Sequence, residues 1–243
     1  MSAGVAPLRV LCLHGFSMTG RALQGHMRRV TAALEPHVSF SFLDAPHEME
    51  RHPMVAPELL DDATTARAWW RPTQRADRLW EFDGVDESLA CVHRAQAAEV
   101  ERCGAPYDGV LGFSQGAGLA SLLVALQETP SPSRAIEHPV RFACFFGGFQ
   151  FSPAVPDLSA DFCGAPFHLP SLHVYGARDE VIKPRQGRKL EALFSREGRL
   201  GVEHAGGHVV ASGGEELRQY AAFFDARRRE EAEAPAQCGD MCI

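Results

Sequence analysis

Three side chains, in the order Ser114, Asp179 and His208, could together carry out acyl transfer. Ser114 lies in Gly112-Phe-Ser-Gln-Gly116, the G-x-S-x-G pattern that places a serine on a sharp bend between a strand and a helix. A serine hydroxyl is a weak nucleophile at neutral pH, so it needs a base to accept its proton and an acid to orient that base. A serine on such a bend is followed along the chain by the acid and then by the histidine. The pattern therefore favours serine-dependent hydrolysis.

Each of these assignments has an alternative. Ser114 and Asp179 could each do no more than cap the helix that follows. His204 is the nearest alternative base, but it would lie at a strand end, whereas His208 follows two glycines that allow the loop to turn back. Glu180 is the alternative acid, and we expect it to face solvent or a helix start. We therefore favour Asp179 and His208.

A metal site is the other interpretation of the two histidines. His204 and His208 are four residues apart, as zinc ligands on a helix would be, but Ala-Gly-Gly between them disfavours a helix. No third ligand is suggested by the sequence. We expect neither a metal ion nor a cofactor.

The negative charge that develops on the carbonyl oxygen during acyl transfer needs backbone N–H donors. Gln115, the residue after the serine, should supply one of them. Phe16 should supply the second, because Gly15 allows the chain to turn after the first strand. We expect His14 to support this loop and not to take part in catalysis.

The elements that must position these residues alternate along the chain. Short apolar runs predict strands, and apolar residues at helical spacing predict helices. Because most strands are apolar on both faces, they predict a mainly parallel sheet with helices on both sides and ligands at the carboxyl ends of the strands. The expected strands are 8–13, 38–43, 109–113, 141–146, 172–175 and 200–203, and the expected helices are 19–34, 86–103, the segment after Ser114, 184–194 and 215–228.

An irregular segment, 48–84, interrupts this alternation and contains all three tryptophans of the chain. We expect it to fold over the site as a cap. Its aromatic side chains could form the apolar wall of an acyl pocket, or they could only anchor the segment to the core. The candidates are Trp69, Trp70 and Trp80, together with Phe149 and Phe151.

Composition limits the classes of partner. The 243 residues carry a net charge of −7, which offers no electrostatic attraction for nucleic acid or an anionic membrane. No run of apolar residues is long enough to span a bilayer, and no secretory signal is recognisable. Seven scattered cysteines without a C-x-x-C pair suggest a reducing compartment, so we expect a cytoplasmic protein. Nothing in the sequence indicates the oligomeric state.

Short motifs distributed over nearly the whole chain make it resemble the FSH family (family of serine hydrolases), a compact branch of the α/β-hydrolases. The matching segments are Leu11-Cys-Leu-His-Gly-Phe16, Asp44-Ala-Pro-His47, Trp69-Trp70, Glu87-Ser-Leu89, Gly109-Val-Leu-Gly-Phe-Ser-Gln-Gly-Ala117, Gly148-Phe149, Leu169-Pro-Ser-Leu-His-Val174, Asp179-Glu-Val-Ile182 and Gly206-Gly-His208. The resemblance implies an α/β-hydrolase fold and places Ser114, Asp179 and His208 at the positions of the family's catalytic triad. Arg71, where an aromatic residue is more usual, and the extra Lys183 before Pro184 depart from the family pattern.

We therefore expect residues 1–228 to form a single α/β-hydrolase domain, with 48–84 as the cap and 229–243 as a disordered tail. The expected activity is hydrolysis of carboxylic esters, with apolar acyl chains, through an acyl-enzyme on Ser114. Two alternatives remain: a thioesterase acting on acyl thioesters, and a receptor that binds a ligand on the same fold without turnover.

Overall fold

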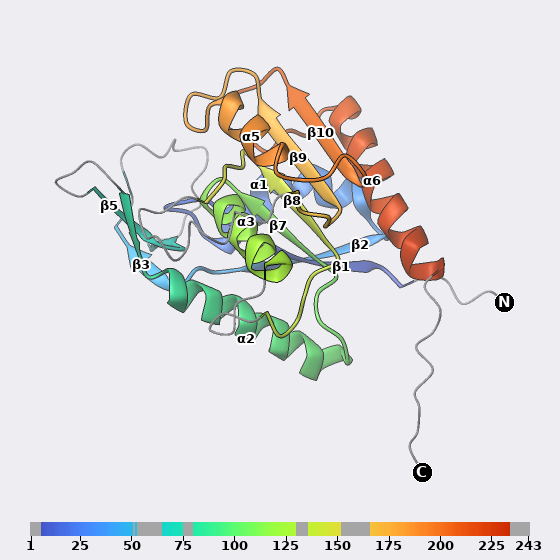
Figure 1. Cartoon of the computed structure of the whole chain (residues 1–243), viewed down its shortest axis with the longest axis horizontal. Coiled ribbons are helices and arrows are strands. Elements are labelled where there is room, and N and C mark those ends of the chain that lie inside the picture. Colours follow the sequence, from blue (N-terminus) through green and yellow to red (C-terminus); the bar gives the residue numbers. More distant parts are fainter. Residues whose placement is uncertain are drawn as a thin grey trace, which may run out of the picture.

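A parallel sheet of six strands forms the centre of the molecule (Figure 1). The computed structural model describes residues 6–50, 52, 65–74, 80–129, 136–151 and 166–233. The strand order is β10-β9-β8-β7-β1-β2, and every neighbouring pair is parallel, as the apolar runs predict. The strands are β1 (Leu8–Leu13), β2 (Val38–Leu43), β7 (Gly109–Phe113), β8 (Phe142–Phe146), β9 (Ser171–Gly176) and β10 (Arg199–His204).

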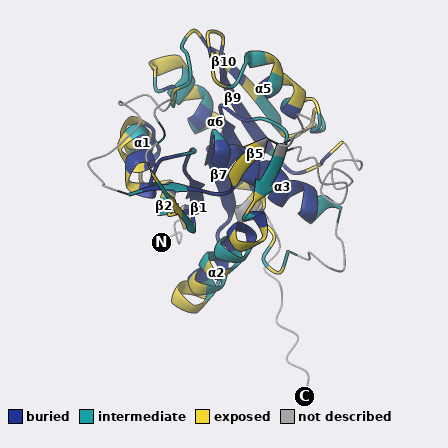
Figure 2. Ribbon diagram, turned by 90° about the vertical axis from the view of Figure 1, so that its left-hand side faces the viewer, coloured by how far each residue is buried: buried dark blue, intermediate teal, exposed yellow. Residues whose placement is uncertain are grey.

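Helices cover both faces of this sheet, which lies buried between them (Figure 2). One face packs against α1 (Gly20–Leu34) and α6 (Gly214–Glu233), which contribute Leu23, Met27 and Phe224 to its apolar cluster. The other face packs against three helices, whose buried side chains belong to a second cluster. These helices are α2 (Val85–Cys103), α3 (Gln115–Glu128) and α5 (Pro184–Glu191).

Local sequence signals fix where the first two helices begin. The Thr19 hydroxyl caps α1 by accepting a hydrogen bond from Ala22 N–H at 3.1 Å. Asp44, at the end of β2, accepts another from Gly20 N–H at 2.7 Å, so a carboxylate lies at the positive end of the helix. Gly84, at φ 90°, lies immediately before α2 in a conformation that glycine adopts without strain.

The segment expected to be irregular instead contains two small antiparallel sheets. β3 (His47–Met49) pairs with β4 (Ala66–Ala68), and β5 (Arg71–Gln74) pairs with β6 (Trp80–Asp83). Strands of three or four residues carry too little apolar alternation to be recognised from sequence. Residues 51, 53–64 and 75–79 of this segment lie outside the described residues, as does the side chain of Trp80.

The last helix runs to Glu233, past the end expected at Arg228. Its final turns lack apolar periodicity, but Arg227 pairs with Glu230 three residues later at 2.7 Å. The start of the expected tail, 229–233, is therefore helical, and 234–243 lie outside the described residues. Among the helices that the structure describes, none has the length and apolarity to cross a membrane.

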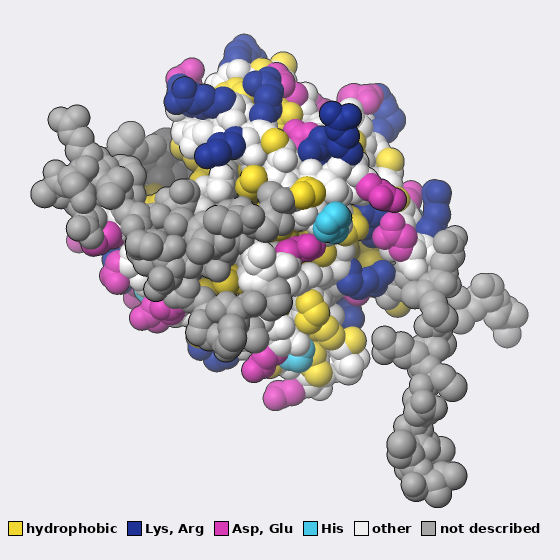
Figure 3. Space-filling view, viewed as in Figure 1, with side chains coloured by type: hydrophobic (Ala, Val, Ile, Leu, Met, Phe, Trp, Pro, Cys, Tyr) yellow, Lys and Arg dark blue, Asp and Glu magenta, His cyan; other side chains and the backbone are white. Residues whose placement is uncertain are grey.

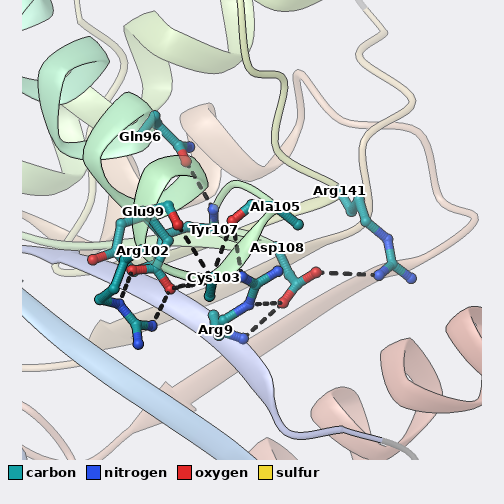
Figure 4. Close-up of polar contacts among 9 residues, drawn as sticks. All are labelled: Arg9, Gln96, Glu99, Arg102, Cys103, Ala105, Tyr107, Asp108 and Arg141. Atoms are coloured by element: carbon teal, nitrogen blue, oxygen red, sulfur yellow. Dashed lines mark hydrogen bonds and ion pairs between the residues drawn. The ribbon is translucent and has the colours of Figure 1, made fainter.

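Ion pairs fasten the amino-terminal edge of the sheet (Figure 4). Asp108, just before β7, accepts a hydrogen bond from Arg9 N–H at 2.8 Å and lies 3.4 Å from Arg141 Nη1, just before β8. Glu99 of α2 is 4% exposed and pairs with Arg102 at 2.6 Å and Arg9 at 3.6 Å. These contacts join β1, β7, β8 and α2 at the edge opposite the one where the strands end.

Candidate active site

Ser114 occupies a strained bend between β7 and α3. Its backbone has φ 53° and ψ −115°, a region that residues with side chains rarely adopt. The bend is tight, because a Cβ on Gly112 would lie 2.3 Å from Gly116 O and one on Gly116 would lie 2.1 Å from Leu13 O. The Ser114 hydroxyl makes no capping hydrogen bond to α3, so the interpretation of this serine as a plain helix cap is wrong.

The two expected N–H donors belong to residues near the serine. Gln115 is the first residue of α3, where backbone N–H groups have no partner within the helix. Phe16 follows Gly15, and a Cβ on Gly15 would be 3.4 Å from the Ser114 Cβ, so the loop after β1 passes directly beside the serine. Within the described part of the chain, neither N–H group donates a hydrogen bond.

Asp179 and His208 form a hydrogen-bonded pair. Asp179 Oδ2 lies 2.7 Å from His208 Nδ1, and Asp179 Oδ1 accepts hydrogen bonds from Val181 N–H at 2.9 Å and Ile182 N–H at 2.8 Å. Because a carboxylate can only accept, the histidine carries its proton on Nδ1. Its Nε2 is then free to act as a base.

The environment of Asp179 keeps it ionised. Its side chain is 1% exposed, and burial alone would raise its pKa. The hydrogen bond and charge of His208, with the two backbone N–H donors, outweigh burial, so the net effect is a lowered pKa. The carboxylate therefore stays charged at neutral pH and can stabilise a protonated imidazole.

The His208 ring lies close to the serine bend. It packs against Phe113, the residue before Ser114, with 4.9 Å between ring centroids. A Cβ on Gly147 would lie 2.9 Å from His208 Cε1, and Phe146, the residue before Gly147, accepts the Ser114 N–H at 2.9 Å. The segments that follow β7, β8 and β10 thus lie close together, with the His208 ring near the serine bend.

The alternative residues are engaged elsewhere. His204 Nδ1 accepts a hydrogen bond from Gly206 N–H at 3.2 Å, and burial lowers the pKa of His204. Glu180 is exposed and pairs with Lys183. The side chain that hydrogen-bonds to Asp179 is His208. The described residues contain no group of three side chains suited to a metal ion.

The aromatic residues of the expected pocket differ in burial: the two tryptophans lie in the core, and Phe149 lies at its edge. Trp69 is fully buried and donates from Nε1 to His14 O at 2.8 Å, so it anchors its segment to the loop after β1. Trp70 is 3% exposed and packs edge-on against Phe149 and Phe151. Phe149 is only partly buried at the edge of this cluster. A pocket lined by Trp69, Trp70 and Phe149 stays a prediction.

Sequence reasoning missed a second contribution from Gln115. Its side-chain amide accepts from Trp69 N–H and donates to Trp70 O, both at 2.9 Å. One residue thus supplies a backbone N–H beside the serine and fastens the β4–β5 connection. Nothing in the local sequence indicates this contact, because it joins segments about 45 residues apart.

Comparison with known proteins places this chain in a family. A family model described as serine hydrolase (FSH1) matches residues 1–220. The chain belongs to this family. Among the relatives of this FSH1 family member, human Esterase OVCA2 is 32% identical over 234 residues, which cover 92% of this chain and 98% of that protein. Esterase C25G4.2 of Caenorhabditis elegans is 32% identical over 229 residues, 89% of this chain and 92% of that protein.

Solved structures share the fold of this FSH1 family member. Zea mays acyl-protein thioesterase 2 has a TM-score of 0.63 at 19% identity and covers 94% of this chain and 96% of its own. Esterase PE8 has a TM-score of 0.62 at 19% identity, with 92% and 94% covered. The chain therefore has the α/β-hydrolase fold that the sequence predicts.

Proposed function

We propose that this protein hydrolyses carboxylic esters through an acyl-enzyme on Ser114, with His208 as the base and Asp179 as the residue that orients it. The observation that carries the proposal is the hydrogen bond from His208 Nδ1 to Asp179, made beside the strained bend that holds the serine. Membership of a serine hydrolase family and the names of the esterase relatives support it.

In the first half of the reaction, His208 Nε2 takes the proton from Ser114 Oγ while Oγ attacks the ester carbonyl carbon. The carbonyl oxygen becomes negative and accepts hydrogen bonds from Phe16 and Gln115 N–H, each worth about 3 kcal/mol in the transition state. The bond to the leaving alcohol then breaks, and His208 gives its proton to the alcohol oxygen.

In the second half, water attacks the acyl-enzyme. His208 takes a proton from the water while the water oxygen bonds to the acyl carbon. It then gives this proton to Ser114 Oγ as the bond between Oγ and the acyl carbon breaks. The carboxylic acid leaves and the enzyme is restored. Asp179 remains ionised throughout and stabilises the imidazolium that forms twice in each cycle.

The acyl group would lie against the partly buried Phe149, with Trp70 behind it, which favours apolar acyl chains. Thioester hydrolysis is the second candidate, because the same steps apply to a thiol leaving group and a fold neighbour is named an acyl-protein thioesterase. The expected cytoplasmic location has support from four free cysteines, Cys12, Cys91, Cys103 and Cys144, in the described part of the chain.

Replacing the nucleophile tests the proposal. Ser114→Ala should lower kcat for p-nitrophenyl esters by about 10³-fold or more, because no acyl-enzyme can form. Wild-type protein should gain the mass of a fluorophosphonate adduct on Ser114, and Asp179 and His208 variants should gain it more slowly. Equal hydrolysis by wild type and Ser114→Ala would reject the mechanism, and a wild type that neither labels nor turns over would favour a ligand receptor.

A further inference from the structure

Two exposed apolar residues neighbour the members of the Asp179–His208 pair along the chain. Val181 is 63% exposed and Val209 is 46% exposed, and they are the two exposed large apolar side chains among the residues that the structure describes. On the described part of the face in Figure 3, acidic and basic side chains are scattered, with apolar side chains between them. Single exposed valines are ordinary on protein surfaces. These two differ because one follows the acid by two positions and the other follows the histidine directly.

The loops that carry the two valines are fastened to each other. Ala177 N–H donates to His204 O at 2.8 Å, and Arg178 N–H donates to Gly206 O at 3.0 Å. Arg178 Nε adds a third bond, to Ala205 O at 2.6 Å. The loops after β9 and β10 therefore form one unit at the carboxyl edge of the sheet.

Each valine is held by the contacts that hold the acid and the histidine. Val181 N–H donates to Asp179 Oδ1, the oxygen that does not contact His208. Val209 N–H donates to Gly207 O at 3.1 Å in the turn around His208. The two exposed side chains consequently have fixed backbones and lose little freedom when they contact a ligand.

The strand order decides which part of a substrate these valines meet. The two N–H donors come from the loop after β1 and the turn after β7, whereas the valines follow β9 and β10, on the other side of β7 in the sheet. The carbonyl oxygen of the substrate must lie toward the donors. The leaving group must lie toward His208, because His208 protonates it.

We propose that Val181 and Val209 form an apolar rim that contacts the leaving group and makes the enzyme prefer esters of apolar alcohols. The proposal rests on the hydrolase function given above and names the substrate class for the leaving-group side. Apolar carbon on the alcohol removes valine surface from water, and this gain grows with alcohol length. A methyl ester carries too little apolar carbon on the alcohol side to benefit from this gain.

The test compares two series of esters. In one, the acyl group stays butyryl and the alcohol lengthens from methanol to octanol; in the other, the alcohol stays methanol and the acyl chain lengthens.

Val181→Thr and Val209→Thr retain the shape of the side chain and replace one methyl group by hydroxyl. The double variant should lower kcat/KM for octyl butyrate about three- to tenfold. The ratio of its kcat/KM for octyl butyrate to that for methyl butyrate should fall by the same factor, and its dependence on acyl length should match that of wild type.

A variant in the opposite direction sharpens the test. Val181→Leu enlarges the rim and should raise kcat/KM for the octyl ester relative to the methyl ester. An unchanged dependence on alcohol length in the double variant, or a change confined to the acyl series, would overturn the proposal. If the double variant then still reacts with a fluorophosphonate at Ser114 as fast as wild type, the hydrolase function stands and only the role of the two valines is rejected.

Discussion

The two oxygens of Asp179 serve different neighbours. Oδ2 accepts a hydrogen bond from Nδ1 of His208, and Oδ1 accepts hydrogen bonds from two backbone N–H groups of the same loop. The carboxylate therefore fixes the tautomer of the histidine and the conformation of the loop that carries the carboxylate itself. Replacing it alters both the base and the fold of the loop.

The lowered pKa of Asp179 predicts a pH-dependent contribution to stability. In the folded protein this carboxyl binds a proton more weakly than in the unfolded chain, where an aspartate has a pKa of about 3.9. The stabilisation is therefore fully present above that pH, and it is lost as the pH falls through the lower folded value.

Urea unfolding of wild type and Asp179→Asn between pH 3 and pH 7 measures this contribution. The difference in free energy of unfolding should be constant from pH 7 to about 5 and should shrink below about pH 4. Asp225→Asn, on α6, serves as the control. A difference that stays constant down to pH 3 would contradict the lowered pKa.

At the scale of elements, α3 is fastened at both ends by glutamine side chains. Gln115 in its first turn binds Trp69 N–H and Trp70 O, and Gln127 in its last turn binds Val140 N–H and Val140 O. Each glutamine amide accepts a hydrogen bond from one backbone N–H group and donates one to a backbone carbonyl oxygen. Only the first of them adjoins the serine.

This symmetry offers a matched pair of variants. Gln115→Ala and Gln127→Ala each leave two backbone groups without their partners, so each should lower the free energy of unfolding by about 1–3 kcal/mol. Only Gln115→Ala should also lower kcat, because the β4–β5 connection next to the site loses its attachment. Equal losses of kcat in the two variants, measured below the unfolding transition, would show that the Gln115 contact has no particular effect on the site.

The elements that sequence predicted well are those with long apolar patterns. All six strands of the sheet and the helices around it were identifiable, because buried parallel strands are apolar throughout and the helices repeat their apolar residues every three or four positions. The small strands β3 to β6 were not, since they depend on pairing between segments distant in the chain. The same limit applies at the site: Ser114, Asp179 and His208 follow recognisable strands, but nothing local indicates that the Gln115 amide binds Trp69 and Trp70.

At the scale of the whole molecule, the two edges of the sheet differ in construction. The carboxyl edge carries the candidate site on loops rich in glycine, and the amino edge is joined by the ion pairs around Asp108 and Glu99 (Figure 4). The full length of the strands separates the two edges. The ion pairs of the amino edge therefore stabilise the fold without contacting the candidate site.

Asp108→Ala tests this separation. Losing the carboxylate leaves Arg9 N–H without its acceptor and removes the ion pairs to Arg9 and Arg141, so the free energy of unfolding should fall by about 2–4 kcal/mol. The kcat at a temperature where the variant is fully folded should equal that of wild type. Thermal unfolding and ester hydrolysis on the same preparation measure both, and a large fall in kcat would show that the two edges are coupled.

The backbone angles of Ser114 also bear on how the chain would respond to selection. A residue with a side chain at φ 53° and ψ −115° costs about 1–3 kcal/mol that glycine would not incur. Mutants recovered for heat tolerance alone should therefore drift toward glycine at this codon, whereas mutants recovered for turnover should keep serine. In the proposed mechanism, the chain keeps a serine here for turnover at a cost in stability.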